Sequence, residues 1–394
     1  MSRAILLLLL LSLPGAWAAA ATTRSDAAAA GPAMTAALRD MCGSEVAALG
    51  EPAGHGDART LTFKSALVRQ LVDRCGFDAI FFEGSSYDFL ELERRQRRGE
   101  PVTRAMVSSA LGGLWNRYAE MQPLITWLHE RTTAGRLRLG GFDDQLGSAG
   151  AFYSIGEMPA ELSGLLEGEK AGQCREEFRR RIYGEVGSAA AERAPLQSCV
   201  YAIRTALAAQ PRTGEREERL HMLANVERYA ARDWSDEAAH MRGRDHSMWL
   251  NYQWLRARLP RGSKIILWGA TVHLAREATS SPGFPAGGNF GAYLHRAHGR
   301  RAFFLGFTAA SGTYRSGGAV KTLPPAAPDS LEQVALRDAH AEQVYLGRAA
   351  LQARGRILGG VFAHEPIRDD WSRILDGLVV FRQERAPELV PPAS

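Results

Sequence analysis

A strand, a helix and a second strand follow one another early in this chain, and this order constrains the fold more than any other feature. Residues 46–48 form an apolar run before a loop that contains His55, and a second apolar run ends at Glu83. Residues 63–75 between them have helical spacing. Strand, helix and strand of this length form a βαβ unit. Because ligands bind beyond the carboxyl ends of parallel strands, we expect His55 and Glu83 to be neighbours at that edge.

Two further predicted strands also end in polar residues. Residues 136–142 alternate like a strand and stop at Asp143 and Asp144, and the buried run 264–268 is followed by His273. More strands are predicted at residues 301–308, 343–346 and 377–382. Strands separated by helices predict an α/β fold with one mainly parallel sheet flanked by helices.

Two long stretches of the chain are predicted to be helical. Residues 103–133 have continuous helical spacing, and residues 156–259 contain helical signals without a convincing strand. We interpret residues 156–259 as a helical insertion that forms a wall or lid of a single domain spanning residues 35–394.

The N-terminus has the pattern of a secretory signal peptide. A basic start is followed by the apolar block Ala4–Leu13 and small residues before a cleavage point near Ala18 or Ala20. We therefore expect a signal peptide at residues 1–20, a flexible leader at 21–34, and a periplasmic or secreted protein without a membrane span.

The chain has four cysteines, and an even number in an exported protein indicates disulfide bonds. Three pairings are possible, and we favour Cys42–Cys75 and Cys174–Cys199. Cys42 precedes the first strand and Cys75 ends the helix that returns to the same side of the sheet, while Cys174 and Cys199 flank a predicted helical hairpin. The spacing matches no zinc motif.

Charge and motifs exclude several functions. The net charge of +5 is spread over many arginines without a basic stripe, which argues against a nucleic-acid partner. The serine elbow of α/β-hydrolases, the P-loop, the dinucleotide fingerprint and the His-Glu-x-x-His zinc motif do not occur in the sequence. We expect no cofactor and a metal-free site, and the sequence predicts no oligomeric state.

The residues at the strand ends can carry out hydrolysis. A histidine with a carboxylate partner can act as a general base that takes a proton from water, which then attacks an ester or lactone carbonyl. A second histidine, His273, can protonate the leaving oxygen or hold the oxyanion, and Lys64 or Arg59 can stabilise negative charge. Each residue also has a structural interpretation: either histidine can be a loop or core residue, and Asp143 can cap a helix.

Several short motifs, in order along the chain, resemble the erythromycin esterase-like family. They are Leu49-Gly50-Glu51 with His55-Gly56, Lys64, Phe82-Glu83, Gly141-Phe142-Asp143, Arg244-Asp245 with Met248, the strand from Ile265 to His273, and Asn289 to Leu294. The similarity covers residues 46–382.

This resemblance implies a metal-independent hydrolase that opens macrolide lactones with activated water, and a role in the response to antibiotics. By position, His55 matches the presumed general base, Glu83 an acidic active-site residue and His273 the second histidine of an Ala-His-Asn-x-His run. The supporting residues of the candidate site are Glu51, Arg59, Lys64, Asp143, Arg244 and Asp245.

The sequence departs from the family pattern at Ala270, where the family has the first histidine of that run. If another histidine, such as His240, His246 or His295, fills this space, an enzyme with a small ester or lactone substrate is favoured. An apolar crevice with an open histidine would instead favour a non-catalytic periplasmic protein that binds a small ligand, haem or iron.

Overall fold

The computed structural model describes residues 31–52, 54–146, 152–182, 190–278, 288–337 and 339–391. The predicted signal peptide and most of the predicted leader lie outside these residues. Helix α2 (Pro32–Met41) begins inside the stretch expected to be leader, and its Met34 and Met41 are fully buried. Within the described ranges, none of the helices is both long and apolar enough to cross a bilayer.

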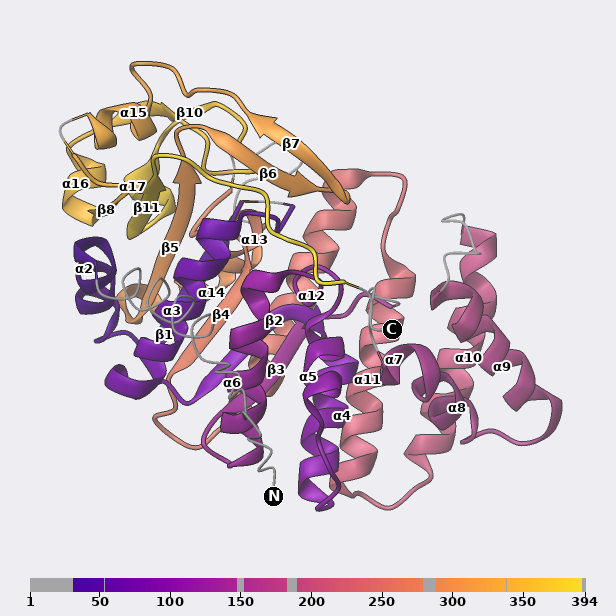
Figure 1. Cartoon of the computed structure of the whole chain (residues 1–394). Coiled ribbons are helices and arrows are strands. Elements are labelled where there is room, and N and C mark those ends of the chain that lie inside the picture. Colours follow the sequence, from indigo (N-terminus) through magenta and orange to yellow (C-terminus); the bar gives the residue numbers. More distant parts are fainter. Residues whose placement is uncertain are drawn as a thin grey trace, which may run out of the picture.

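Seven strands of the described chain form one sheet in the order β3-β2-β4-β1-β5-β11-β8 (Figure 1). Neighbouring strands are parallel except β8, which is antiparallel to β11. The prediction of a mainly parallel sheet flanked by helices is therefore confirmed. The strands are β1 (Val46–Glu51), β2 (Ala79–Ser85), β3 (Arg138–Asp143), β4 (Ile265–Ala270), β5 (Ala302–Ala309), β8 (Gln343–Gly347) and β11 (Gly377–Phe381).

Helices cover both faces of the sheet, which explains why its inner strands are apolar at nearly every position. In β1, Ala47 and Leu49 belong to one core, while Val46 and Ala48 belong to the core on the other face. The first core includes α2, α3 (Ala58–Cys75), α5 (Arg104–Leu111) and α6 (Gln122–Thr133). The second includes α12 (Glu237–Ala257), α14 (Phe290–His298), α15 (Leu331–Leu336), α16 (Arg348–Gln352) and α17 (Trp371–Ile374).

The first strand–helix–strand unit is present, but its two strands are not neighbours. Strand β4 lies between β1 and β2, with Glu51 opposite Ala270 and Phe82 opposite Trp268. The residues that follow β4 therefore lie between the loop after β1 and the end of β2. This arrangement places His273 between the two residues that the sequence predicted to be adjacent.

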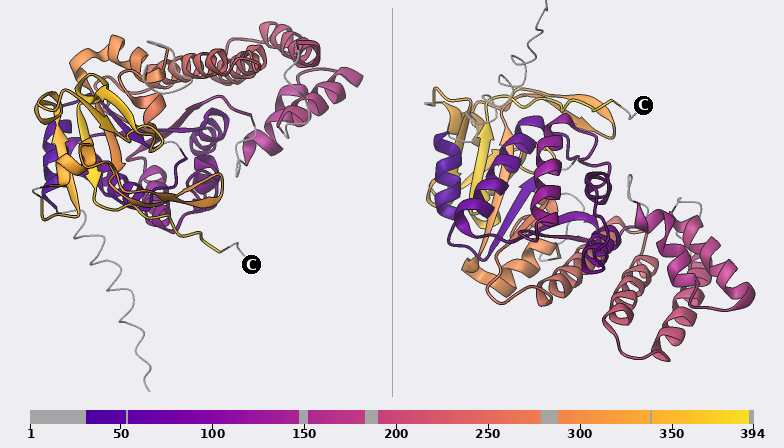
Figure 2. Two further views of the ribbon diagram at one scale, coloured as in Figure 1. Left: turned by 90° about the horizontal axis from the view of Figure 1, so that it is seen from above. Right: turned by 60° about the horizontal axis from the view of Figure 1, so that its bottom comes forward.

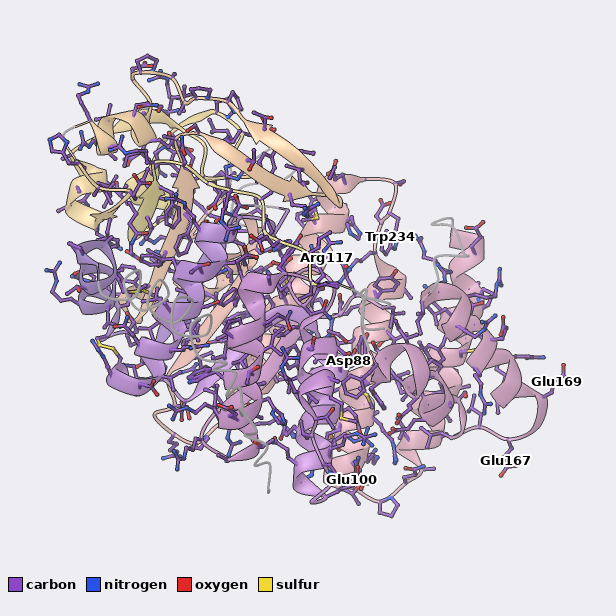
Figure 3. All side chains as sticks on the ribbon, viewed as in Figure 1. Asp88, Glu100, Arg117, Glu167, Glu169 and Trp234 are labelled. Atoms are coloured by element: carbon purple, nitrogen blue, oxygen red, sulfur yellow. A yellow bond between two sulfur atoms is a disulfide. The ribbon has the colours of Figure 1, made fainter. Side chains whose placement is uncertain are left out.

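A helical arm leaves the sheet after β3 and projects away from it (Figure 2). It contains α7 (Tyr153–Gly156), α8 (Met158–Ser163), α9 (Gly168–Ile182), α10 (Ala190–Ala208) and α11 (Gly214–Ala231). The arm has its own apolar core, which includes Phe178, Ile203 and Met222. Its far end is marked by Glu167 and Glu169 in Figure 3.

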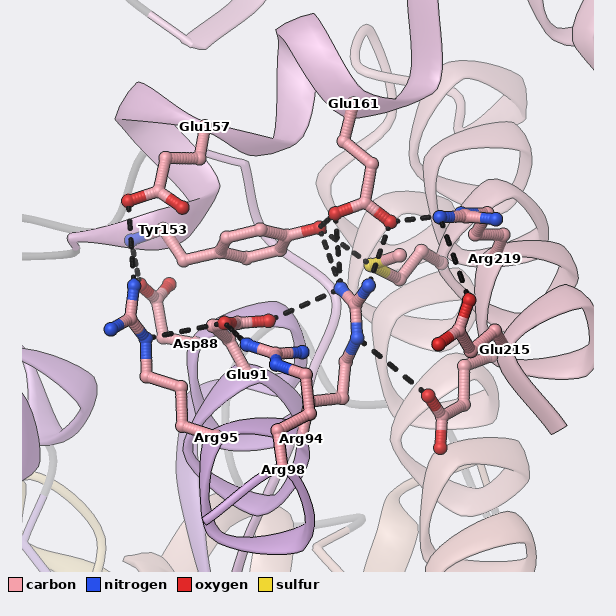
Figure 4. Close-up of polar contacts among 12 residues, drawn as sticks. Asp88, Glu91, Arg94, Arg95, Arg98, Tyr153, Glu157, Glu161, Glu215 and Arg219 are labelled. Carbon is pink, nitrogen blue, oxygen red and sulfur yellow. Dashed lines mark hydrogen bonds and ion pairs between the residues drawn. The ribbon is translucent and has the colours of Figure 1, made fainter. Parts of the chain in front are cut away.

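Ion pairs join the arm to helix α4 (Ser86–Arg97), as Figure 4 shows. Glu161 of α8 accepts hydrogen bonds from Arg94 at 2.9 Å and from Tyr153 at 2.7 Å. We call this group the charged seam, and it consists of Glu91, Arg94, Arg97, Tyr153, Glu161, Glu218, Arg219 and Arg258.

Both favoured disulfide pairings are present. Cys42–Cys75 joins the end of α2 to the end of α3, with a Cα–Cα distance of 5.1 Å. Cys174–Cys199 joins α9 to α10 within the arm, with a Cα–Cα distance of 5.4 Å.

The single helix predicted over residues 103–133 is wrong, because the chain forms α5, a loop, the short helix η1 (Ala119–Met121) and then α6. Gly112 ends α5 with φ 79°, a backbone conformation that favours glycine. The sequence analysis also missed α4, the β6–β7 hairpin (Gly312–Ser316 and Ala319–Leu323) and the β9–β10 hairpin (Arg356–Gly359 and Ile367–Asp370).

Candidate functional site

Four neighbouring strands bring the predicted polar residues to one edge of the sheet. Glu51 ends β1, Asp143 ends β3, and Glu83 lies near the end of β2. His273 lies in α13 (Thr271–Leu274), which directly follows β4. Because β3, β2, β4 and β1 are adjacent in this order, these residues share the carboxyl edge of the sheet. All four are buried.

Glu51 is the centre of a first group of side chains. One carboxylate oxygen accepts hydrogen bonds from Nδ1 of His55 at 2.7 Å and from Nε1 of Trp115 at 2.6 Å. The other oxygen accepts from Nζ of Lys64 at 2.6 Å. The ring of Trp115 also meets the His55 ring edge-on, with 5.1 Å between centroids. These contacts fix the position and orientation of the His55 imidazole.

The two nitrogens of His55 therefore have different environments. With its proton on Nδ1, the ring donates to the Glu51 carboxylate and leaves Nε2 with a free lone pair. Within the described part of the chain, no protein group forms a hydrogen bond to Nε2. Nε2 is thus free to accept a proton from a bound molecule.

The loop around His55 needs two unusual backbone conformations. His55 has φ 57° and Gly54 has φ 113°. Gly56 packs against β6, where a Cβ on residue 56 would lie 2.1 Å from the carbonyl oxygen of Arg315. The N–H of Arg315 donates to the carbonyl of Gly56 at 2.8 Å. The hairpin missed by the sequence analysis thus holds the loop that presents His55.

Arg244 of α12 is the centre of a second group. Its Nη2 donates to Glu83 at 2.9 Å and to Asp143 at 2.6 Å, and its Nη1 lies 3.0 Å from Nε2 of His273. The second oxygen of Glu83 accepts from the backbone N–H of Ala270 at 2.7 Å. One guanidinium therefore joins the ends of β2 and β3 to the residue after β4.

Asp245 fixes the other side of the His273 ring. Nδ1 of His273 lies 3.0 Å from the carboxylate of Asp245, which also accepts from the N–H of Phe290 at 2.6 Å. Phe290 is the first residue of α14, so this carboxylate also satisfies a free N–H at a helix start. His273 is held on both sides, in contrast to His55.

Charge interactions connect the two groups and shift their pKa values. Burial alone would raise the pKa of Glu83. The charges of His273, Arg244 and His55 outweigh burial and lower this pKa to about 2. Burial lowers the pKa of Lys64 to about 8, although Glu51 and then Glu83 oppose this change. Glu83 is therefore ionised at neutral pH, and Lys64 carries a proton that it can release near pH 8.

Two other pKa values follow from the same contacts. Burial opposes the charged form of Glu51, yet Lys64 and His55 lower its pKa overall. Burial also opposes the charged form of His273, but Asp245 and Glu83 raise its pKa overall despite the nearby Arg244. The carboxylates thus favour a protonated His273.

Of the predicted supporting residues, the structure brings Glu51, Lys64, Asp143, Arg244 and Asp245 into these two groups but not Arg59. The guanidinium of Arg59 pairs with Glu342 at 3.0 Å and its side chain is 37% exposed. Glu342 directly precedes β8, on the far side of the sheet from β3, β2 and β4, which explains why Arg59 is absent from the two groups.

Burial lowers the pKa of His240 to about 4, and the charges of Arg244 and Asp143 also act on it, so this histidine lies near the second group. His240 packs on Trp234 and His246 on Tyr293, while His295 lies near Phe304. The backbone N–H of Ala270 holds Glu83. This edge is not apolar, because Glu51, Lys64, Glu83, Asp143 and Arg244 form ion pairs there.

Trp115 is a site residue that the sequence analysis missed. It lies in the loop after Gly112 and is fully buried. The Gly112-Gly113 pair was the available signal, since glycines interrupt helices and would have separated Trp115 from the predicted helix.

Solvent reaches the site mainly at Arg244 and His55. The side chains of Arg244 and His55 are 12% and 10% exposed, more than the other members of the two groups. Two surface cavities of about 740 and 780 Å³ lie elsewhere, near the amino ends of β3 and of β1, β4 and β5. Among the described residues, the His, Cys, Asp and Glu side chains form no group suited to a metal ion.

Comparisons with known proteins agree with this fold. A family model described as erythromycin esterase matches residues 72–376. No curated protein matches the chain significantly.

Three solved structures share the fold. A protein from Bacillus cereus is 18% identical, with a TM-score of 0.68 over 90% of this chain and 92% of that one. A succinoglycan biosynthesis protein is 14% identical, with a TM-score of 0.69 over 92% and 94%. A histidine-to-asparagine mutant of the erythromycin esterase EreC, in its open conformation, is 17% identical, with a TM-score of 0.65 over 91% and 95%.

Proposed function

The chain belongs to the erythromycin esterase family, and on this premise we propose that it hydrolyses an ester or lactone with water activated by His55. Family membership supports a hydrolase with a small-molecule substrate. The attack by water and the residues that assist it are inferred from the contacts at the carboxyl edge of the sheet.

One observation carries the proposal: Glu51 binds Nδ1 of His55 and leaves Nε2 without a protein partner among the described residues. In the proposed reaction, Nε2 takes a proton from water while the water oxygen bonds to the carbonyl carbon. Glu51 keeps the ring in the required tautomer and stabilises the imidazolium that forms. Trp115 holds the same carboxylate oxygen and limits movement of the ring.

Arg244 supplies positive charge for the oxyanion that forms on the carbonyl oxygen. It is one of the two most exposed members of the site, and both Arg244 and His55 act on the charge of Glu83, so in this proposal one substrate contacts both residues. Glu83 and Asp143 hold Arg244 in place, and Nη1 of Arg244 also lies 3.0 Å from Nε2 of His273. Such fixed charges in a buried site strongly stabilise developing negative charge.

The intermediate then collapses by breaking its bond to the leaving oxygen. The proton moves from the His55 imidazolium to the leaving alkoxide, which gives a carboxylic acid and an alcohol. Glu83 does not supply this proton, because its pKa of about 2 keeps it ionised. The proposed reaction uses water as its only second substrate.

We also propose that the mature protein is exported, with a signal peptide at residues 1–20 and one domain that includes the helical insertion at 156–259. The two disulfide bonds support this location because such bonds persist in oxidising compartments. If the substrate is a macrolide lactone, hydrolysis would give the protein a role in the response to that antibiotic.

The function is tested with purified mature protein and a panel of esters and lactones, including macrolides, with and without a chelator. We expect release of acid from at least one substrate and equal rates with the chelator. Tight binding of a compound without turnover would contradict the enzyme and favour a ligand-binding protein. Loss of turnover with the chelator would contradict the metal-free reaction.

A further inference from the structure

A buried aspartate–histidine pair lies beside the loop that carries His55, and the proposed reaction does not use it. Nε2 of His364 lies 2.6 Å from Oδ1 of Asp57, and the two side chains are 3% and 2% exposed. Asp57 is the last residue before α3, and His364 lies between β9 and β10. The contact therefore joins the His55 loop to a distant part of the chain.

The backbone at His364 is held in an uncommon conformation. Ala363 and His364 have φ 51° and 62°, a region that residues other than glycine seldom adopt. Such conformations persist where surrounding contacts fix them, and they often occur at functional sites. Glycine would be more favourable at these positions if the turn only reversed the chain. We infer that the contact of the His364 side chain with Asp57 offsets the cost of the left-handed backbone.

The position of Asp57 gives the pair influence over His55. Only Gly56 separates the two residues, and its carbonyl accepts a hydrogen bond from the N–H of Arg315. The loop is thus held at Gly56 by β6 and at Asp57 by His364. Movement of Asp57 would be transmitted directly to the left-handed residue that presents the imidazole.

Neither partner has a substitute contact. Oδ2 of Asp57 and Nδ1 of His364 are buried and have no hydrogen-bond partner in the described part of the chain. The ring of Tyr314 covers His364, with 4.6 Å between centroids. Removal of either side chain would leave the other polar group buried and unpaired, which is costly.

A second buried carboxylate, Glu384, lies close enough to act on the pair. Glu384 accepts from the backbone N–H groups of Arg59 and Thr60 at the start of α3, at 2.6 and 3.2 Å. Burial and the charge of Asp57 raise the pKa of Glu384 to about 7. Burial disfavours the charged form of His364, but Asp57 and Glu384 raise its pKa overall. The other titratable groups that act on the pair are Lys64, Glu332 and Tyr314, and Glu365 acts on Tyr314.

We propose that Asp57 and His364 are positioning residues that hold the catalytic loop so that Nδ1 of His55 stays on Glu51. The inference rests on the proposed role of His55. The pair touches neither His55 nor the Arg244 group in any contact described above, so it acts through the backbone of residues 55–57. Two buried acid–histidine pairs therefore lie next to this loop. Glu51–His55 takes part in the reaction, and Asp57–His364 holds the loop in position.

The test compares His364→Ala, His364→Gln and Asp57→Asn by steady-state kinetics on folded protein. We expect His364→Ala and Asp57→Asn to lower kcat at least about tenfold with KM within about twofold, because small displacements of a catalytic group strongly reduce rate. His364→Gln can still donate to Asp57 and should restore part of kcat. If one variant does not fold, the other two still test the proposal.

A matched control is His298→Ala. His298 is also buried and its Nε2 lies 2.8 Å from the hydroxyl of Tyr252, but it is the last residue of α14, near the amino ends of the strands. This variant should lower the melting temperature and leave kcat unchanged. Wild-type kcat in both His364→Ala and Asp57→Asn would overturn the positioning role.

The ¹⁵N chemical shifts of the His55 ring provide a readout that does not need a substrate. We expect His364→Ala to shift the His55 Nδ1 signal, and the His298→Ala signal to match wild type. If wild type hydrolyses nothing, the proposed function fails while this spectrum still tests positioning. Identical His55 signals in wild type and His364→Ala would contradict the inference.

Discussion

The carboxyl edge of the sheet and the charged seam are both dense clusters of charge, yet they differ in chemistry. At the edge, the carboxylates Glu51 and Glu83 are buried and contact imidazoles as well as cations. In the seam, carboxylates such as Glu161 pair with arginines, and Arg97 is 48% exposed. The seam as defined contains no histidine.

The difference shows that the number of ion pairs does not identify a reactive site. Both clusters join elements that are far apart in the sequence, and the seam attaches the arm to α4. Of the two clusters, only the edge contains a base, His55, whose Nε2 can accept a proton from a bound molecule. The edge also contains the guanidinium of Arg244, which ion pairs hold in place. We therefore expect edge variants to change rate and seam variants to change stability alone.

The largest expected difference is between His55→Ala and Glu161→Gln. Loss of a general base removes up to about four orders of magnitude of rate. We expect kcat/KM of His55→Ala to fall at least about a thousandfold, and that of Glu161→Gln to stay within about twofold. Wild-type turnover in His55→Ala would remove this residue from the mechanism.

A second contrast is the acid dependence of stability. Folding lowers the pKa of Glu83 from 4.5 to about 2. Ionised Glu83 therefore adds to the free energy of unfolding above pH 4.5, and this addition is lost as pH falls towards 2. This contribution is up to about 3 kcal/mol. Urea unfolding between pH 5 and pH 3 should show a flatter pH dependence for Glu83→Gln than for wild type. An equal pH dependence would show that Glu83 is not held as an ion.

Arg244→Met should reduce kcat by about a hundredfold, because it removes a charge that stabilises the oxyanion. It also leaves Glu83 and Asp143 without their cation, so folded protein must be quantified first. Arg219→Met is the matched seam variant, because Arg219 also pairs with a carboxylate, Glu161. Equal kcat values for the two variants would contradict the distinction between edge and seam.

The smallest effect is expected for Glu218→Gln. Glu218 pairs with Arg97 at 2.7 Å and with Arg258 at 3.0 Å, and both arginines are partly exposed. Thermal unfolding should show a loss of about 1 kcal/mol, as for a partly solvated ion pair, with no change in kcat. A large loss of activity would mean that attachment of the arm controls the reaction.

The sequence predicted those features that depend on local pattern. Apolar runs followed by polar residues located β1, β2, β3 and β4 and placed His55, Glu83, Asp143 and His273 after them. Parallel strands share one carboxyl edge, so the meeting of these residues followed from the fold class. The positions of the cysteines relative to the predicted strands and helices were sufficient to predict both disulfide bonds.

Features that depend on long-range pairing could not be predicted from local pattern. The insertion of β4 between β1 and β2 is set by strand pairing across more than half of the chain. Trp115 reaches Glu51 only because a loop replaces the predicted helix. Arg59 and Lys64 both follow the loop, but only Lys64 pairs with Glu51, whereas Arg59 pairs with Glu342. The Asp57–His364 contact joins residues that no sequence motif connects.

The central claim is that hydrolysis occurs at the carboxyl edge, with His55 as the base and Arg244 beside the oxyanion. The most direct measurement is a crystal structure with a phosphonate analogue of the best ester or lactone substrate. Our account predicts that phosphonate oxygens lie within about 3 Å of Nε2 of His55 and of the Arg244 guanidinium. A phosphonate bound in either cavity near the amino ends of the strands, or away from both residues, would contradict it.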